Sequence, residues 1–417
     1  MKILNNTFKT SHDCFECTYC SKARYTENRN ISVNCKLINK GYIEQKSSRI
    51  CQHYKSKIFE KRSLKEFLPY SIWIEITNTC NLKCKMCGQR GDHGYLNSPD
   101  SGMLRKNLSI EEWIKFIDDV KSYARWINIR GGEPLLYPHI VEFMRNVHEN
   151  NIFLSLETNA TYLKNYAYDL AKYVDLLSIS VDGPRETHDY VRGVEGTYDK
   201  VKEGILEYKK ACKELKVDKM RPISFNCTIG VDNYKYIQRM IEVSKDMDVK
   251  KINLSLSYYL DGDDGRDYEK TMKEEFATNA VAWSGFYKES KIRKNMNFNL
   301  LIKNITSLLY NQDGIAFTIT PYISNESIIK WFKDSKTLLF YDRCYVPWFL
   351  ANIMPNGDVN FCCDYDDYII GNITEHNLLD LWFNEKALKF RKNILNERFS
   401  ICKRCGVNFY FPLTRMP

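Results

Sequence analysis

Short apolar runs alternate with amphipathic stretches through the middle of the chain. Six runs rich in β-branched and aromatic residues predict strands, at 71–77, 126–130, 152–157, 176–181, 223–229 and 251–257. Between them, apolar residues recur every three or four positions and predict helices, one opening at 109 and others near 138–150, 162–174, 197–215 and 232–247. The first helix begins with a capping box, Ser109-Ile-Glu-Glu. Six successive β-then-α units predict an α/β fold with a parallel sheet and right-handed crossovers.

Short polar or cysteine-bearing segments follow four of the predicted strands. These segments are 80–87, 131–133, 158–159 and 182–183. Chemistry in parallel α/β folds gathers at the carboxyl ends of the strands. We therefore expect the four segments to lie along one rim and to form the active site.

The length and composition allow a large core and argue against a membrane protein. The chain has 417 residues, of which 44% are hydrophobic and 27% are charged. It has no run of about 18 apolar residues and no apolar signal stretch at its start, so a cytoplasmic location is expected. The formal net charge is +9. Because Lys and Arg are dispersed, and metal-bound thiolates would offset part of this charge, nucleic-acid binding is not expected.

The 15 cysteines fall mostly into three groups. In a reducing compartment such clustered thiols indicate metal binding rather than disulfides. The groups divide the chain into four parts, namely an N-terminal Cys-rich metal-binding module (1–66), an α/β core (67–260), a linker and helical region on the substrate side (261–340) and a C-terminal metal-binding module (341–417). Within the third part, DGDDGRD at 261–267 is acidic and Gly-rich and is expected to form a loop.

The middle group, Cys80, Cys84 and Cys87, has the most specific spacing. Three thiolates at intervals of four and three residues can hold one face of a 4Fe-4S cluster and leave one iron open to an outside ligand. The alternative is a zinc site, for which His93 is the one nearby fourth ligand. The position of the motif directly after a first strand favours the cluster.

Cys80-x3-Cys84-x2-Cys87 after the first predicted strand and Gly131-Gly132-Glu133-Pro134 after the second make the sequence resemble the radical SAM superfamily. The resemblance implies a partial (β/α)6 TIM-like barrel over roughly residues 70 to 260. It also implies a 4Fe-4S cluster whose open iron binds S-adenosylmethionine (SAM). One electron from an external reductant, such as flavodoxin or ferredoxin, would then yield a 5′-deoxyadenosyl radical that abstracts a substrate hydrogen. Such an enzyme would be oxygen-sensitive.

The same resemblance implies a set of SAM contacts, which are Gly131, Gly132, Glu133, Thr158, Asn159, Ser180, Asp182 and Arg192. Lys85 and Met86 would lie over the adenine. Ordinary structural explanations stay open, because Pro134 suits the start of a helix and Asp182-Gly183-Pro184 suits a turn. No catalytic base or hydrogen donor can be chosen. Cys227, within the fifth predicted strand, is more simply a buried structural thiol.

The C-terminal group predicts a second metal site. Cys344, Cys362, Cys402 and Cys405 could saturate an auxiliary 4Fe-4S cluster, with Cys363 as a substitute ligand. A tight-turn signal at 355–358 predicts a β-hairpin, followed by a helix near 377–394. The pattern resembles the SPASM or twitch extension of radical SAM enzymes, and the lack of cysteines after Cys405 implies a single auxiliary cluster. A structural zinc knuckle is the alternative.

The N-terminal group also predicts a metal site, of less certain composition. Cys14, Cys17, Cys35 and Cys51 are the preferred ligands, and Cys20 and His53 compete with them. Either zinc or a further iron–sulfur cluster would suit this set.

Three functions are compatible with these patterns. The first is a radical SAM enzyme that oxidises or epimerises a small-molecule or sugar-derived substrate, with the auxiliary cluster as electron relay. The second is a radical SAM enzyme that modifies a peptide or protein by cross-linking, epimerisation or residue oxidation. The third is a non-catalytic, zinc-rich scaffold. The sequence identifies neither the substrate nor the net reaction.

Overall fold

The structure is a computed structural model that describes residues 20–25, 31–35, 43–45, 67–97, 104–217, 221–311, 313–339, 344–396 and 398–407. The first three ranges are described as backbone only and form a small antiparallel sheet, with β1 (Cys20–Tyr25), β2 (Ile31–Cys35) and β3 (Ile43–Gln45) in that order. Cys14, Cys17, Cys51 and His53 lie outside the described residues, so the N-terminal metal site stays a prediction.

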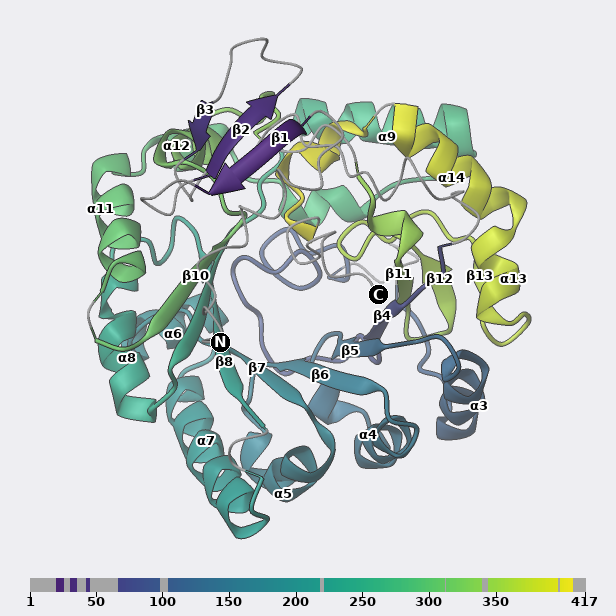
Figure 1. The fold of residues 1–417 in the computed structure, drawn as a ribbon, viewed down its shortest axis with the longest axis horizontal. Coiled ribbons are helices and arrows are strands. Elements are labelled where there is room, and N and C mark those ends of the chain that lie inside the picture. The colour runs from purple at the N-terminus through teal and green to yellow at the C-terminus, as the bar shows by residue number, and fades with distance from the viewer. Residues whose placement is uncertain are drawn as a thin grey trace.

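In the described part of the chain, a ten-stranded sheet curves into an open barrel with strand order β10-β9-β8-β7-β6-β5-β4-β11-β12-β13 (Figure 1). The six predicted strands are confirmed within one or two residues, as β4 (Ser71–Glu75), β5 (Trp126–Arg130), β6 (Phe153–Thr158), β7 (Leu176–Ser180), β8 (Ile223–Ile229) and β9 (Lys251–Leu256). They pair in parallel in sequence order. The sheet does not close on itself, which confirms the partial barrel.

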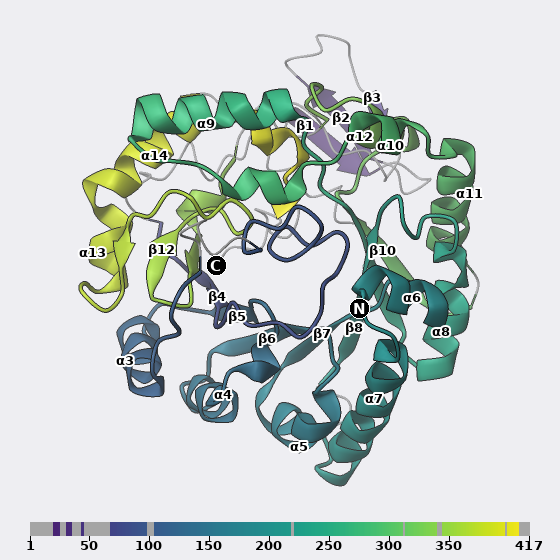
Figure 2. The same ribbon diagram turned by 180° about the vertical axis from the view of Figure 1, so that it is seen from behind.

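Helices cover the outside of this arc (Figures 1 and 2). They are α3 (Ile110–Val120), α4 (Ile140–Glu149), α5 (Leu163–Tyr173), α7 (Thr197–Glu214), α8 (Met240–Met247, preceded by the 3-10 turn η4, Ile237–Arg239) and α11 (Phe298–Leu309). Alternate strand residues such as Ile72, Ile74 and Ile127 point outward into the core beneath these helices. The intervening, more polar positions therefore face the inside of the barrel. The capping box at Ser109 is present.

The described residues between 261 and 339 form several helices and one strand. They contribute α9 (Gly262–Phe276), the 3-10 turn η5 (Ala282–Phe286), α10 (Ser290–Lys294), α11, β10 (Ala316–Thr320) and α12 (Asn325–Lys333). β10 extends the parallel sheet beyond β9. The loop expected at 261–267 is wrong, because α9 begins at Gly262. Acidic residues in a first helical turn are favoured by the helix dipole, and Tyr268, Met272 and Phe276 bury one face of α9.

The C-terminal part continues the same sheet. After the 3-10 turn η6 (Val346–Trp348), β11 (Leu350–Ile353) pairs in parallel with β4, and β12 (Asp358–Asn360) and β13 (Gly371–Asn372) follow as antiparallel strands. The predicted hairpin is thus confirmed. The single helix expected near 377–394 is two helices, α13 (Leu378–Phe383) and α14 (Glu385–Asn396), because Asn384 is extended and its side chain caps α14 through the Ala387 N–H. A 3-10 turn, η7 (Ser400–Arg404), carries Cys402.

The short helix α6 (Arg185–Arg192), after β7, was not expected from the sequence. The 3-10 turn η3 (Pro134–Leu136), after β5, begins at Pro134, as the structural explanation of that segment allowed. None of the helices described in the structure has both the length and the apolar character needed to cross a bilayer.

Candidate active site

The loop after β4 carries Cys80, Cys84 and Cys87 and lies inside the curve of the sheet (Figure 2). Cys87 N–H donates to the Cys84 carbonyl at 3.0 Å, which winds the loop tightly. Lys85 N–H donates to the Val191 carbonyl at 2.9 Å and ties the loop to α6. The thiols of Cys80, Cys84 and Cys87 are half-buried and free of disulfides.

The electrostatics of this loop suit a metal cluster. Burial raises the pKa of the Cys84 thiol to about 11, and the neighbouring Cys87 adds to the rise, although the Arg192 guanidinium opposes it. Burial likewise raises the pKa of Cys80. Thiols in this setting stay protonated until a cationic metal displaces their protons. The three residues therefore fit the iron cluster that the spacing predicts.

The segment 131–133 packs directly against the start of this loop. Glu133 N–H donates to the Thr79 carbonyl at 2.7 Å, and Gly132 N–H donates to the Thr77 carbonyl at 2.8 Å. A Cβ at Gly132 would lie 2.2 Å from the Thr79 carbonyl oxygen, so only glycine permits this approach. Pro134 opens η3, so the structural role of the segment is present as well.

Glu133 joins two of the predicted SAM-binding segments. Its buried carboxylate accepts hydrogen bonds from Thr158 Oγ1 at 2.6 Å and from Asn159 N–H at 2.8 Å. Burial raises the pKa of Glu133 to about 7, while these hydrogen bonds oppose the rise. The ends of β5 and β6 are thereby held together beside Cys80.

Asp182 and Arg192 form a buried ion pair with 2.7 Å between Arg192 Nη2 and Asp182 Oδ2. Arg192 Nη1 also lies 3.6 Å from Cys84 Sγ. Asp182 therefore holds a guanidinium against the cysteine loop. Ser180 is half-buried on the inner face of β7. The eight residues proposed as SAM contacts surround one rim of the barrel, although their contact with SAM stays a prediction.

A cavity of about 150 Å³ opens beside the cysteine loop. Lys85 and Met86 line it, as expected for residues that lie over an adenine. The ends of β8 and β9 contribute Thr228 and Ser257 to its wall. The sequence analysis did not select these two residues. Both lie at the carboxyl end of a predicted strand, close to where the recognised motifs follow theirs. His93, the fourth ligand of the zinc alternative, lines the same cavity and packs edge-on against Tyr287.

The η5 segment packs directly against the cysteine loop, because Gly285 approaches Gly88 closely and Phe286 lines the same cavity. Phe286 packs on Tyr365 of the C-terminal part, with ring centroids 5.3 Å apart. Asp367 accepts hydrogen bonds from the N–H groups of Val281 and Ala282, at 2.7 and 3.0 Å. The segment therefore connects the first cysteine loop with the loop that follows Cys363.

Substitution of Gly285 by alanine is expected to destabilise this junction by about 1–3 kcal/mol, the usual range for overpacking. A Cβ there would lie 1.9 Å from the Gly88 carbonyl oxygen. Gly262→Ala is the matched control, because its Cβ would meet only the flexible Arg266 guanidinium, at 3.0 Å. Anaerobic urea unfolding of the metal-loaded protein measures both variants. Equal midpoints for the two would contradict the proposed close contact.

The C-terminal cysteines form a second group of thiols. Burial raises the pKa of Cys362 well above its usual value, and the nearby Cys402, Cys344 and Cys405 raise it further. Four half-buried thiols whose ionised forms would repel one another fit a saturated cluster, in which each thiolate binds a different iron. In the described part of the chain, no three Cys, His, Asp or Glu side chains converge on a position for a single metal ion.

Cys363 belongs to a second hydrophobic cluster, separate from the one that contacts Cys362 and Cys402, although Cys344 and Cys405 pack against it. Cys363 packs with Trp73 and Leu350. Burial raises the pKa of its thiol, and the nearby Arg130 guanidinium opposes part of that rise. Neighbouring residues of an extended chain face opposite sides. The geometry therefore favours Cys362 over Cys363 as the ligand. Cys227 is fully buried in the main hydrophobic core, in line with a structural thiol.

Comparison with known families identifies the two metal-binding parts. Residues 74–242 match the family described as the radical SAM superfamily, and residues 344–406 match SPASM, an iron–sulfur cluster-binding domain. The chain is a radical SAM enzyme with a C-terminal SPASM domain. Its cofactors are accordingly SAM, a 4Fe-4S cluster and an auxiliary iron–sulfur cluster.

Several known proteins resemble this radical SAM enzyme. An AdoMet-dependent heme synthase from Methanosarcina barkeri is 26% identical over 346 residues, which is 82% of this chain and 89% of the relative. A probable GTP 3′,8-cyclase from Methanococcus aeolicus is 26% identical and covers 63% of this chain and 92% of its own length. Among solved structures, Streptococcus suis SuiB bound to S-adenosylmethionine matches with a TM-score of 0.53 at 16% identity, over 81% of this chain and 72% of SuiB. AdoMet-bound anSMEcpe matches with a TM-score of 0.54 at 21% identity, over 78% and 80% of the two chains. These structures share the fold.

Proposed function

We propose that this radical SAM enzyme oxidises or epimerises a small-molecule or sugar-derived substrate, with the auxiliary cluster as electron relay. The observation that carries the proposal is the position of the cysteine loop, inside the curve of the sheet and in contact with the segment 131–133, with Arg192 and with η5. When bound, SAM and its cluster supply a 5′-deoxyadenosyl radical.

The chain's own residues would hold and orient these groups. Cys80, Cys84 and Cys87 would bind three irons, and Glu133 or the neighbouring carbonyls would receive the methionine ammonium. Met86 and the cavity beside it would take the adenine. Arg192, fixed by Asp182, would stabilise the negative charge of the thiolates, because its guanidinium already lies against Cys84.

The names of the relatives support a small-molecule substrate. The heme synthase and the GTP cyclase both act on small molecules by name, and the first aligns over most of this chain. Peptide modification is the second candidate, because SuiB bound to its precursor peptide SuiA shares the fold over 82% of this chain, with a TM-score of 0.51. Flavodoxin or ferredoxin is proposed as the external reductant.

Anaerobic turnover tests the proposal. The reconstituted enzyme should be brown and hold about eight irons per chain for two clusters, or about twelve if the N-terminal module binds a third. With reductant and SAM it should release 5′-deoxyadenosine. A deuterated substrate should transfer one deuterium atom to that product, as mass spectrometry detects, and screening small molecules against peptides separates the two candidates. A colourless protein that leaves SAM intact would refute the proposed function.

A further inference from the structure

Charged side chains on the inner face of the barrel are concentrated at the ends of β4, β5 and β6. Glu75 and Arg130 are paired neighbours across β4 and β5. Glu157 follows on β6 and accepts a hydrogen bond from Asn128 at 3.1 Å. Farther round the inner face, the corresponding positions of β7 to β10 are neutral and polar, including Ser178, Ser180, Asn226, Asn253 and Thr318.

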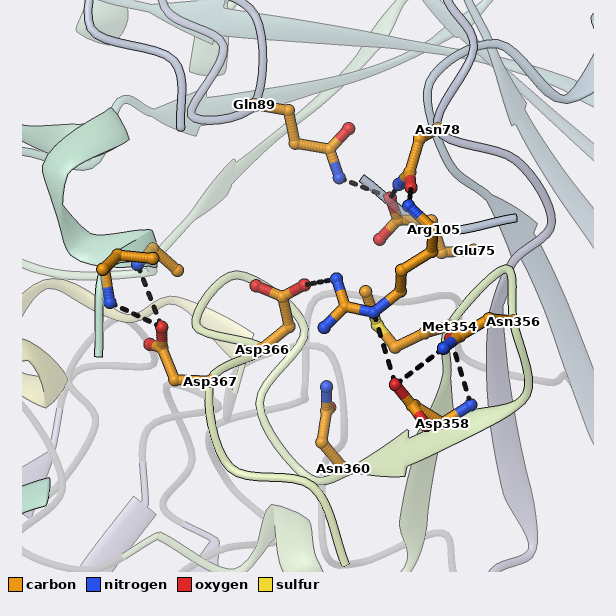
Figure 3. Close-up of polar contacts among 12 residues, drawn as sticks. Glu75, Asn78, Gln89, Arg105, Met354, Asn356, Asp358, Asn360, Asp366 and Asp367 are labelled. Carbon is orange, nitrogen blue, oxygen red and sulfur yellow. Dashed lines mark hydrogen bonds and ion pairs between the residues drawn. The ribbon is translucent and has the colours of Figure 1, made fainter. Parts of the chain in front are cut away.

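The C-terminal domain adds more carboxylates to the same place. Arg130 Nη2 lies 3.4 Å from Asp364 Oδ1. Arg105 lies between Asp366, at 3.1 Å, and Asp358, at 3.5 Å (Figure 3). We call Glu75, Glu157, Asp364 and Asp366, together with Arg105 and Arg130, the acidic patch. It is the contact between the barrel rim and the SPASM domain.

The charges of the acidic patch do not balance. Four carboxylates share two guanidinium groups, and Arg105 is further shared with Asp358. Among the described residues, no cationic group forms an ion pair with Glu75, whose Oε1 accepts hydrogen bonds from Asn78 at 2.7 Å and Gln89 at 2.6 Å. Burial raises the pKa of Glu75 to about 7 and the negative charge of Asp366 adds to the rise, although Arg130, Gln89 and Arg105 oppose it. A buried carboxylate without an ion-pair partner is costly to ionise, so further positive charge here would stabilise the ionised form of Glu75.

Two buried polar atoms beside the patch also lack partners. Among the described residues, neither Asp366 Oδ1 nor Asn360 Nδ2 has a hydrogen-bond partner, although Asp366 and Asn360 are only 2% and 1% exposed. In Figure 3 the Asn360 amide points toward the pair formed by Arg105 and Asp366. Buried polar groups normally find partners. An unpaired acceptor and an unpaired donor therefore indicate a polar ligand.

The acidic patch adjoins the reaction centre and is open to it in part. Gln89 follows Cys87 by two residues, and Arg130 directly precedes Gly131. The side chains of Arg130 and Asp364 are 21% and 17% exposed, so this end of the patch is accessible to a ligand. None of the patch residues is among the proposed SAM contacts, which leaves the patch for the second reactant.

We propose that the acidic patch binds a protonated amine or guanidinium group of the substrate. The inference rests on the proposed radical SAM function and adds a substrate class to it. The cation would complete the charge balance of Glu75 and Asp366, and the neutral hydroxyls and amides of β7 to β10 would take the uncharged polar remainder. Phosphate- or carboxylate-rich molecules, such as GTP, would be repelled from this site.

Binding of matched ligand pairs tests the inference. Anaerobic calorimetry of the reconstituted, SAM-loaded enzyme compares glucosamine with glucose, and Nα-acetyl-lysine amide with Nα-acetyl-norleucine amide. We expect the charged member of at least one pair to bind about tenfold or more tightly than its neutral partner. Glu75→Gln and Asp364→Asn should each remove most of that preference. Glu203→Gln, which removes an exposed carboxylate on α7 paired with Lys164, should keep it.

The possible results distinguish failure of the cation site from failure of the proposed function. Wild-type enzyme that cleaves SAM but binds both members of each pair equally, or neither, would overturn the cation site and leave the proposed function intact. Preference that survives both Glu75→Gln and Asp364→Asn would overturn it as well. Wild-type enzyme that fails to cleave SAM would instead refute the proposed function. If Glu75→Gln fails to take up clusters, the partly exposed Asp364→Asn variant decides.

Discussion

Alanine at Cys80, Cys84 or Cys87 is expected to abolish the reductive cleavage of SAM. Each thiol would hold one iron. Without any one of them the cluster would not assemble, and the open iron that binds SAM would be lost with it. Changes to groups that merely support a metal ligand cost about 10–100-fold in affinity or activity. Loss of a ligand itself should cost at least about 1000-fold. Release of 5′-deoxyadenosine from the anaerobically reconstituted protein measures the effect.

Cys212→Ala is the matched control for this experiment. Cys212 is buried on α7 and belongs to the hydrophobic core beneath the helices, away from both groups of clustered thiols. Its loss should leave iron content and cleavage close to wild type. Full cleavage by any of the three loop variants would show that the active-site assignment is wrong.

Alanine at Cys402 or Cys405 should separate SAM cleavage from substrate turnover. Both residues belong to the C-terminal thiol group, and neither lies in the loop after β4. Iron content should fall by about four per chain. Cleavage of SAM without substrate should continue in part, whereas conversion of substrate should stop because its electron has no acceptor. Iron analysis and product release measured on one preparation test both statements.

The adjacent pair Cys362 and Cys363 supplies the control. Cys362→Ala should lose the same iron as the Cys402 variant, because its thiol lies among the other three. Cys363→Ala should keep the auxiliary cluster, since this thiol faces Arg130 and Trp73 instead. The reverse result would exchange the two assignments.

The sequence was sufficient to predict the six strands β4 to β9 and the main motifs. Each of the runs from SIWIEIT to KINLSLS contains alternating apolar residues that bury beneath helices, so local pattern and tertiary packing agree. β10 was missed because AFTIT is short and lies at the edge of the sheet, where only Ile319 is buried. The start of α9 was missed because its acidic, Gly-rich residues are typical of loops.

Other features depend on contacts that no local pattern records. Spacing cannot choose between Cys362 and Cys363, because adjacent residues have nearly the same reach and differ in the direction of the side chain. The contact of Gly285 with Gly88 joins segments almost 200 residues apart. The pairing of Arg105 with Asp366 spans a still larger separation. These features become visible only when the chain is folded.

The parallel pairing of β11 with β4 bears on electron movement. Leu350 to Ile353 are aligned with Ser71 to Ile74 in one hydrogen-bonded ladder, so the two cysteine-bearing halves are strands of one sheet rather than bodies on a tether. The distance that an electron tunnels between the two metal centres would then not vary with hinge motion. Truncation before the SPASM domain would instead remove β11 from its place beside β4. The unpaired edge strand would then be exposed to solvent and would favour aggregation.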